Sequence, residues 1–315
     1  MGILLVLLNT LGLASASAAP ATPPTAHAIQ HVFVIAMENH DAREIIGNKT
    51  NAPYINNVLI PQGAQATDFK DELPLSVPSE PHYLWMEAGT RTFLDHKFGS
   101  DADPSAANST KSTNHLVTQI KNSTAGVTWI TYQEGQDATT GACPVVSSGF
   151  YAAKHNPFVF FQDVAGKPPS KTNAYCAAHS KPLKNLGADL NTNKMENYVF
   201  ITPDLCHDMH GATGCPKGNS IRIGDDWLRL NLPRLIDWVT KNAGVIFITW
   251  DEGENTSTMP FLALGPGVKA SYSGKVPYNH SSIVKSVEEI FNLPVLATVA
   301  KNNDLSDLFK PGSFP

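Results

Sequence analysis

The feature that most constrains this chain is a set of uninterrupted apolar runs separated by segments with helical periodicity. The runs are rich in Val, Ile and Phe and cover residues 31–37, 127–132, 198–202, 245–250 and 261–264. Unbroken runs of this kind are typical of strands that are buried on both faces of a parallel sheet. Helical patterns occupy the intervening and following segments, at 54–60, 115–121, 227–240 and 281–291. This alternation predicts an α/β fold with a mostly parallel central sheet and helices on both faces.

The chain is predicted to form a single domain with loop insertions. Polar stretches rich in Ser, Asn, Lys and Pro at 99–111 and 166–192 predict loops or small insertions. The composition of 42% hydrophobic and 16% charged residues supplies a sizeable core and excludes disorder as the main state. The net charge is −5, and no block of like charges occurs, which argues against a nucleic-acid or polybasic membrane partner.

The N-terminus has the composition of an export signal. Residues 3–13 are nearly all apolar, and small residues follow up to Ala19. This stretch is too short to cross a bilayer comfortably, and a signal peptidase would cut among the small residues. We therefore expect a signal peptide over 1–19, a leader over 20–30 and one folded domain over 31–315, in a secreted or periplasmic protein without stable membrane insertion. A buried first helix is the alternative.

The four cysteines fit an oxidising compartment. They are Cys143, Cys176, Cys206 and Cys215, and an even count predicts two disulfides. Three pairings are possible, and proximity in sequence favours Cys143–Cys176 and Cys206–Cys215. Five Asn-x-Ser/Thr sequons would accept glycans only in a eukaryotic secretory pathway, and they fit chance occurrence equally well: Asn48, Asn108, Asn122, Asn255 and Asn279.

Polar residues follow three of the apolar runs, where ligands bind in open α/β sheets. Glu38 and Asn39 follow the first run, Asp208 follows the run at 198–202, and Asp251 and Glu252 follow the run at 245–250. Each pair alone is typical of an ordinary turn or helix cap. Together, converging carboxylates repel one another and need a cation, and their oxygen ligands suit a hard divalent metal.

Several shorter motifs leave a functional and a structural interpretation open. Ser79 precedes a predicted helix at 83–87, where it is either a cap or a nucleophile that gains from the free backbone N–H groups. Lys154 to Pro157 is either an anion contact or a loop. The segment 206–210 resembles a zinc site, but the exported context favours a disulfide at Cys206. Asp225 and Asp226 fit a structural role in the first turn of the helix at 227–240.

The order of these motifs resembles the acid phosphatase branch of the phosphoesterase family. That family also contains the bacterial phospholipases C and has an alkaline-phosphatase-like fold. The resemblance rests on the segments 31–39, 46–48, 52–56, 78–83, 154–157, 202–210, 224–228, 249–252 and 279–282. One departure is His82, which stands where most relatives have Asn.

The resemblance implies a role for each matched residue. Glu38, Asn39, Asp251 and Glu252 would bind one divalent ion (Mg, Ca, Mn or Zn), and Ser79 would complete the sphere as nucleophile. The remaining matched residues would line the phosphate pocket: His82, His155, Asp208, His210 and His280. The implied activity is hydrolysis of small phosphate monoesters through a phosphoserine. A phospholipase C-like phosphodiesterase, a non-catalytic phosphate-binding protein and a serine acyl-esterase are the alternatives, and the oligomeric state is open.

Overall fold

A computed structural model describes residues 1–2, 29–192 and 194–315, so most of the predicted signal peptide and of the leader lies outside the described residues. The described chain forms one sheet whose strand order is β4-β3-β5-β1-β6-β7-β2-β8. All neighbouring strands are parallel except β7, which runs antiparallel to both β6 and β2. The predicted mostly parallel α/β sheet is confirmed.

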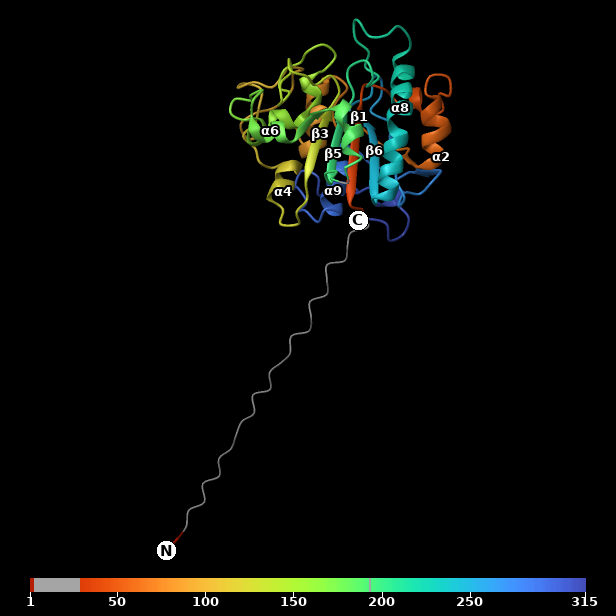
Figure 1. Ribbon diagram of the computed structural model, residues 1–315. Helices are drawn as coiled ribbons and strands as arrows, with labels where there is room; N and C mark the ends of the chain where they lie inside the picture. The colour runs from red at the N-terminus through yellow and green to blue at the C-terminus, as the bar shows by residue number, and fades with distance from the viewer. Residues whose placement is uncertain (3–28, 193) are drawn as a thin grey trace.

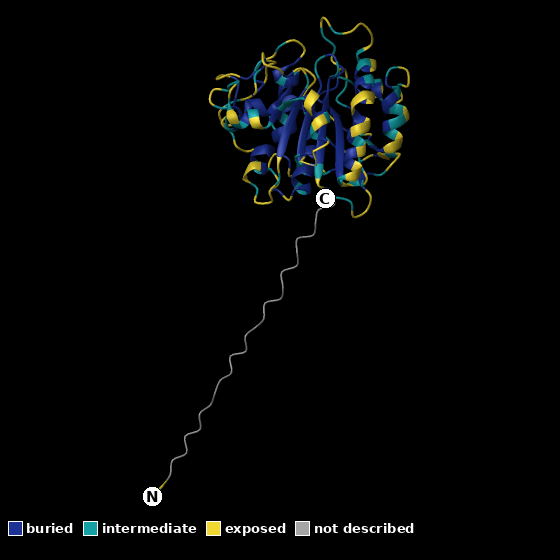
Figure 2. Ribbon diagram, in the orientation of Figure 1, coloured by how far each residue is buried: buried dark blue, intermediate teal, exposed yellow. Residues whose placement is uncertain are grey.

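The longer strands follow the apolar runs closely. They are β1 (His31–Met37), β3 (Trp129–Gln133), β5 (Tyr198–Thr202), β6 (Gly244–Trp250) and β7 (Phe261–Leu264). Figure 2 shows these strands as a continuous buried layer, and Phe33, Phe200 and Phe247 are at most 1% exposed. Three strands of three residues each were not predicted: β2 (Ala64–Ala66), β4 (Ser180–Pro182) and β8 (Tyr272–Gly274).

Helices cover both faces of the sheet. In Figure 1 α8 (Ser220–Lys241) lies in front of β6, and α9 (His280–Ile290) lies behind the sheet, where it packs against α3 (Ser79–Ala88). The shorter helices are α1 (Ala42–Ile45), α2 (Ile60–Gln62), α4 (Leu116–Asn122), α5 (Gln162–Ala165), α6 (Ala174–Ala178) and α7 (Leu186–Asp189). The segment predicted at 54–60 is mainly a π-helix, η1 (Ile55–Leu59), and the 3₁₀ turns are η2 (Ala153–His155), η3 (Pro157–Phe160), η4 (Leu183–Asn185) and η5 (Ser306–Leu308).

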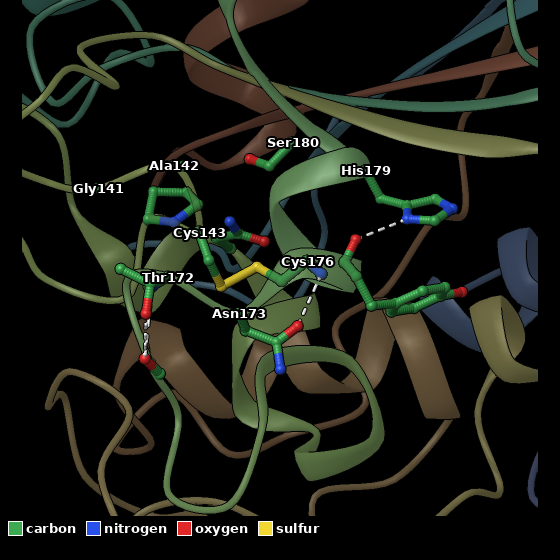
Figure 3. Close-up of a disulfide and its surroundings, with 12 residues drawn as sticks. Gly141, Ala142, Cys143, Thr172, Asn173, Cys176, His179 and Ser180 are labelled. Carbon is green, nitrogen blue, oxygen red and sulfur yellow. Dashed lines mark hydrogen bonds between the residues drawn. A yellow bond between two sulfur atoms is a disulfide. The ribbon is translucent and has the colours of Figure 1, made fainter.

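The segment 166–192, predicted to form loops or small insertions, contains the short elements α6, β4 and α7 between its loops. Here β4 pairs with β3 at the edge of the sheet, and the Cys143–Cys176 disulfide joins α6 to an earlier loop. Figure 3 shows this disulfide, beside which Asn173 Oδ1 accepts the backbone N–H of Cys176 at 3.0 Å. The second disulfide joins Cys206 and Cys215, so both predicted pairings are confirmed.

The start of α8 holds the loop after β5 close to the sheet. A Cβ on Gly224 would lie 2.3 Å from Met209 Cγ, so only glycine lets this loop pack so tightly against the helix. The next residue, Asp225, accepts the backbone N–H groups of Tyr54 and Ile55 at 2.8 Å each. Its role is structural, as predicted, but it lies inside α8 and anchors another segment instead of capping this helix.

Candidate active site

Three adjacent central strands end together and carry the predicted acids. In the order β5-β1-β6, the chain continues from these strands into the loops that contain Asp208, Glu38 and Asp251. Backbone hydrogen bonds hold the strand ends in register, from Glu38 N to Asp208 O at 2.8 Å and from Asp251 N to Met37 O at 3.0 Å. The sheet therefore delivers three carboxylates to one place, which is where open α/β sheets bind ligands.

Ser79 is the first residue of α3 and lies between two of the acids. Its Oγ is 3.3 Å from Glu38 Oε2 and 3.1 Å from Glu252 Oε1, and the side chain is buried. No side-chain cap closes this helix end, so Ser79 does not serve as a cap. The hydroxyl instead faces the predicted metal ligands.

The acids are buried and poorly compensated. Burial raises the pKa of Glu38 to about 7, against the hydrogen bond from Tyr83, and burial likewise raises the pKa of Glu252 to about 7. Burial and then the neighbouring Glu38 carboxylate raise the pKa values of Asp208 and Asp251 well above the ordinary value. Four such carboxyl groups in one pocket favour a bound cation, because ionised acids repel one another where water is excluded.

His155 and Tyr83 complete the pocket around Glu38. The His155 and Tyr83 rings stack with centroids 4.7 Å apart, and Tyr83 donates to Glu38 Oε1 at 2.7 Å. His155 Nε2 is 3.2 Å from the same Glu38 oxygen, and its Nδ1 is 3.7 Å from Asp208 Oδ2. Burial, followed by the charges of Lys154 and His210, lowers the pKa of His155 well below its usual value, which favours the neutral imidazole.

His82 lies on the other side of Ser79, between two acids. Its Nδ1 is 3.1 Å from Asp71 Oδ1, and its Nε2 is 3.6 Å from Glu252 Oε2 and 3.2 Å from Val77 O. Burial alone would lower the pKa of His82, but the bond and charge of Asp71 and the charge of Glu252 outweigh it and raise that pKa. His82 is thus the imidazole of this site that is favoured as a cation.

The two other predicted phosphate-pocket histidines have partners of their own. His280 starts α9, is buried, and has Nε2 at 2.8 Å from Trp250 O; burial lowers its pKa to about 4. His210 is exposed, with its Nδ1 at 2.7 Å from Gly211 O, while its backbone N–H donates to Asp208 Oδ1 at 2.8 Å. Neither ring contacts Ser79, so their predicted roles stay predictions.

The residues fit a divalent cation. Buried oxygens without a hydrogen-bond donor include Asn39 Oδ1, Asp208 Oδ2 and Asp251 Oδ2. Glu38, His155 and Asp208 offer ligand atoms within 4.8 Å of one another and could also hold a metal ion. Asn39 adopts a left-handed φ of 24°. Its backbone N–H donates to Asp251 Oδ1 at 3.2 Å, and its Nδ2 donates to Glu252 Oε1 at 3.3 Å. The predicted ligands and this triad share Glu38.

The sequence interpretation missed Tyr83 and Asp71. Tyr83 lies one helical turn after Ser79, so their i,i+4 spacing on α3 could have placed both at Glu38. Asp71 lies in an irregular segment, and no sequence signal connects it to His82. Zinc binding by the Cys206 thiolate is excluded, because Cys206 is in a disulfide.

Solved structures share the fold. The murine ectonucleotide pyrophosphatase/phosphodiesterase 5 superposes with a TM-score of 0.57 at 10% identity over 89% of this chain and 100% of that chain. A protein of the alkaline phosphatase superfamily from Vibrio parahaemolyticus superposes with a TM-score of 0.53 at 10% identity over 91% of this chain and 75% of that one. The α/β fold of this chain is therefore alkaline-phosphatase-like.

Sequence comparisons identify the family. A phosphatidylinositol-3-phosphatase from Mycobacterium tuberculosis is 28% identical over 89% of this chain and 82% of its own length. A probable acid phosphatase from Kluyveromyces lactis is 25% identical over 85% of this chain and an acid phosphatase from Aspergillus fumigatus 25% over 92%, although the chain covers only 60% and 61% of their lengths. The Phosphoesterase family model matches residues 62–294. The chain is a hydrolase and belongs to the Phosphoesterase family.

Proposed function

We propose that this protein is a secreted, metal-dependent acid phosphatase that cleaves phosphate monoesters through a phosphoserine at Ser79. The observation that carries the proposal is the position of the Ser79 hydroxyl at the start of α3, between the buried carboxylates of Glu38 and Glu252. The relatives named as phosphatases support a monoester substrate.

Ser79 is the nucleophile of the proposed reaction. Its Oγ attacks phosphorus in line, the P–O bond to the alcohol breaks, and the alcohol leaves as phosphoserine forms; water then cleaves the phosphoserine and releases phosphate. The Ser79 hydroxyl donates toward Glu252 or Glu38, and these carboxylates are the first acceptors for its proton. A divalent ion bound by Glu38, Asn39, Asp251 and Glu252 would supply Lewis acidity that lowers the pKa of the serine hydroxyl and neutralises charge on the phosphoryl group.

The imidazoles stabilise the bound phosphoryl group in two ways, and His82 does so by its charge, because its two nitrogens already face Asp71, Val77 O and Glu252. His82 carries the raised pKa and so supplies positive charge in acidic solution, whereas His155 acts as a neutral donor. Preorganised donors of this kind stabilise the charge that develops on the equatorial oxygens. His210 and His280 are proposed to reach the phosphate when substrate is bound.

Export is the second part of the proposal. The predicted signal peptide and the two disulfides both fit an oxidising compartment. Within the described residues no helix is long and apolar enough to cross a membrane. Sequencing the N-terminus of the exported protein would check cleavage after Ala19.

The test is hydrolysis of an aryl phosphate monoester at pH 5 to 6, by wild type and Ser79→Ala. We expect Ser79→Ala to lower kcat by at least about 10³-fold, because the proposed nucleophile is removed. Ser286→Ala is a matched control, since Ser286 is also a buried helical serine but donates to Ser282 O, outside the site. Near-normal turnover by Ser79→Ala would refute the assignment.

Chelation distinguishes the competing functions. We expect a chelator to abolish turnover, and Mg²⁺, Ca²⁺, Mn²⁺ or Zn²⁺ to restore it. Turnover that is insensitive to chelators would favour a serine acyl-esterase. Faster hydrolysis of diesters than of monoesters would favour a phospholipase C-like enzyme, and phosphate binding without any turnover would favour a binding protein.

A further inference from the structure

Asp101 and Lys154 form an ion pair beside the start of the nucleophile helix. Lys154 precedes His155 on η2, and Asp101 belongs to the loop at 99–111. One oxygen of Asp101 accepts the Lys154 ammonium, and the other accepts the backbone N–H of Glu80 at 3.2 Å. Glu80 directly follows Ser79 in the ten-residue α3. The Asp101 carboxylate therefore occupies two donors, the Lys154 ammonium and the Glu80 N–H, that could also bind another anion beside the nucleophile.

The backbone on both sides of this pair is fixed. The Glu80 side chain accepts the backbone N–H of Ala102 at 3.0 Å, which fixes the loop directly after Asp101. Ser147 joins this loop to η2, because its Oγ accepts Ala153 N at 2.8 Å while its own N–H donates to an oxygen of Asp103 at 2.8 Å. Any exchange at the pair is then a side-chain movement and needs no loop opening.

The two partners differ in their freedom to move. The Asp101 side chain is 36% exposed, whereas the Lys154 side chain is only 18% exposed and belongs to the residue before His155, whose Nε2 lies 3.2 Å from Glu38 Oε1. Asp101 can thus turn toward solvent while Lys154 stays beside the pocket.

We propose that Asp101 takes the place of a phosphoryl oxygen, and that substrate phosphate displaces its carboxylate and binds to Lys154 and to the N–H of Glu80. This inference rests on the proposed function of the Ser79 site. A dianionic monoester carries more charge than one carboxylate and therefore displaces Asp101 from Lys154. A monoanionic diester is attracted less strongly and displaces Asp101 less readily. Lys154 and Asp101 therefore select monoesters over diesters.

Binding of inorganic phosphate, measured by calorimetry at pH 7.5 with the same divalent cation in every sample, tests the exchange. We expect Asp101→Asn to bind phosphate about three- to tenfold tighter, because the competing charge is gone, and Lys154→Gln to bind at least about tenfold more weakly. In the double variant, Asp101→Asn should give no gain, because the donor that it frees is absent.

Asp95→Asn is the matched control, since it makes the same charge change at an exposed aspartate that binds Thr110 and Lys111 instead of Lys154. Weaker phosphate binding by Asp101→Asn would overturn the proposal, because Asp101 would then only orient Lys154. Equal tightening by Asp95→Asn, or no phosphate binding by any variant, would overturn it as well. Thermal unfolding of each variant checks that it is folded.

Hydrolysis of the aryl monoester and of an aryl diester is measured in parallel with binding. Loss of selectivity for the monoester in Lys154→Gln is expected. An inactive wild type that still shows the predicted binding pattern would refute the proposed function and leave the exchange standing. An active wild type without the pattern would refute only the exchange.

Discussion

The two ends of α3 hold two buried clusters of carboxylates and imidazoles that are balanced in opposite ways. At the N-terminal end, Ser79 faces Glu38 and Glu252, and the four buried acids there outnumber the one imidazole, His82, that is favoured as a cation. At the C-terminal end, Glu87 Oε1 is 2.8 Å from His115 Nδ1, and Asp163 Oδ1 is 3.1 Å from His115 Nε2.

This difference distinguishes a site suited to binding a cation from a cluster that stabilises the packing of α3. Burial would lower the pKa of His115, but the hydrogen bonds that it donates to Asp163 and Glu87 outweigh burial and raise that pKa. An imidazolium between two carboxylates is internally compensated. Glu87 Oε1 also accepts Val117 N at 2.7 Å, so the triad ties α3 to α4. The Ser79 end has excess negative charge, which an external cation can balance.

The largest expected effect is on turnover, through Asp251→Asn. We expect kcat to fall by at least about 10²-fold, because one ligand charge of the proposed metal site is lost. In the metal-free protein we expect no loss of stability, since Asn keeps the bond from Asn39 N while one repelling buried charge disappears. Aryl phosphate hydrolysis measures kcat, and urea unfolding after chelation measures the stability of the metal-free protein. A strong loss of stability in the metal-free variant would contradict the comparison.

The second effect is on stability, through Glu87→Gln. We expect the free energy of unfolding to fall by about 3 kcal/mol, because His115 loses one partner of a buried ion pair. kcat in the folded fraction should stay within about threefold, since Glu87 lies on the last turn of α3, far along the helix from Ser79. Urea denaturation gives the free energy of unfolding. Kinetics at urea concentrations below the unfolding transition give kcat. A variant that loses turnover but not stability would place Glu87 in the active site.

The two ends of α3 also differ in how far the sequence predicts them. The acids of the active site follow long apolar strands, so Glu38, Asp208 and Asp251 could be placed together from the strand ends alone. The contacts of Glu87 with His115 and of His82 with Asp71 join elements that are distant in sequence and carry no periodic signal. Tertiary packing decides such pairs.

Element boundaries were less predictable for similar reasons. The helix α8 begins at Ser220, where Asn219 Oδ1 caps it by accepting Arg222 N, seven residues before the predicted start at 227. The early part contains Gly224, which disfavours a helix locally and is retained because Met209 packs against it. The strands β2, β4 and β8 are too short to show a pattern and are held by their neighbours in the sheet.

The smallest expected effect is a pH dependence of stability at the Glu87 end. The raised pKa of His115 contributes stability that is complete below its ordinary value of 6.5 and is lost as pH rises through the folded value. Burial would raise the pKa of Asp163, but the bond and charge of His115 outweigh it and lower that pKa, so its contribution is present above 3.8 and lost in stronger acid. Burial raises the pKa of Glu87, so its contribution is complete below 4.5 and falls as the pH rises. The stabilisation by the triad should therefore be greatest in mild acid, just above 3.8, and smallest above the folded pKa of His115.

Variants of two histidines whose pKa values are shifted in opposite directions test this pH dependence of stability. The advantage of wild type over His115→Asn in free energy of unfolding should be larger at pH 5.5 than at pH 9. His31→Asn is the control, because burial, against the bond with Glu196 O, lowers the pKa of His31; its stabilisation is present above 6.5 and lost as pH falls. Groups that do not contact the substituted histidine, including the active-site acids, cancel in each difference. The same pH trend in both variants would show that the triad is not the source, because two imidazoles shifted in opposite directions cannot lose their stabilisation on the same side of neutrality.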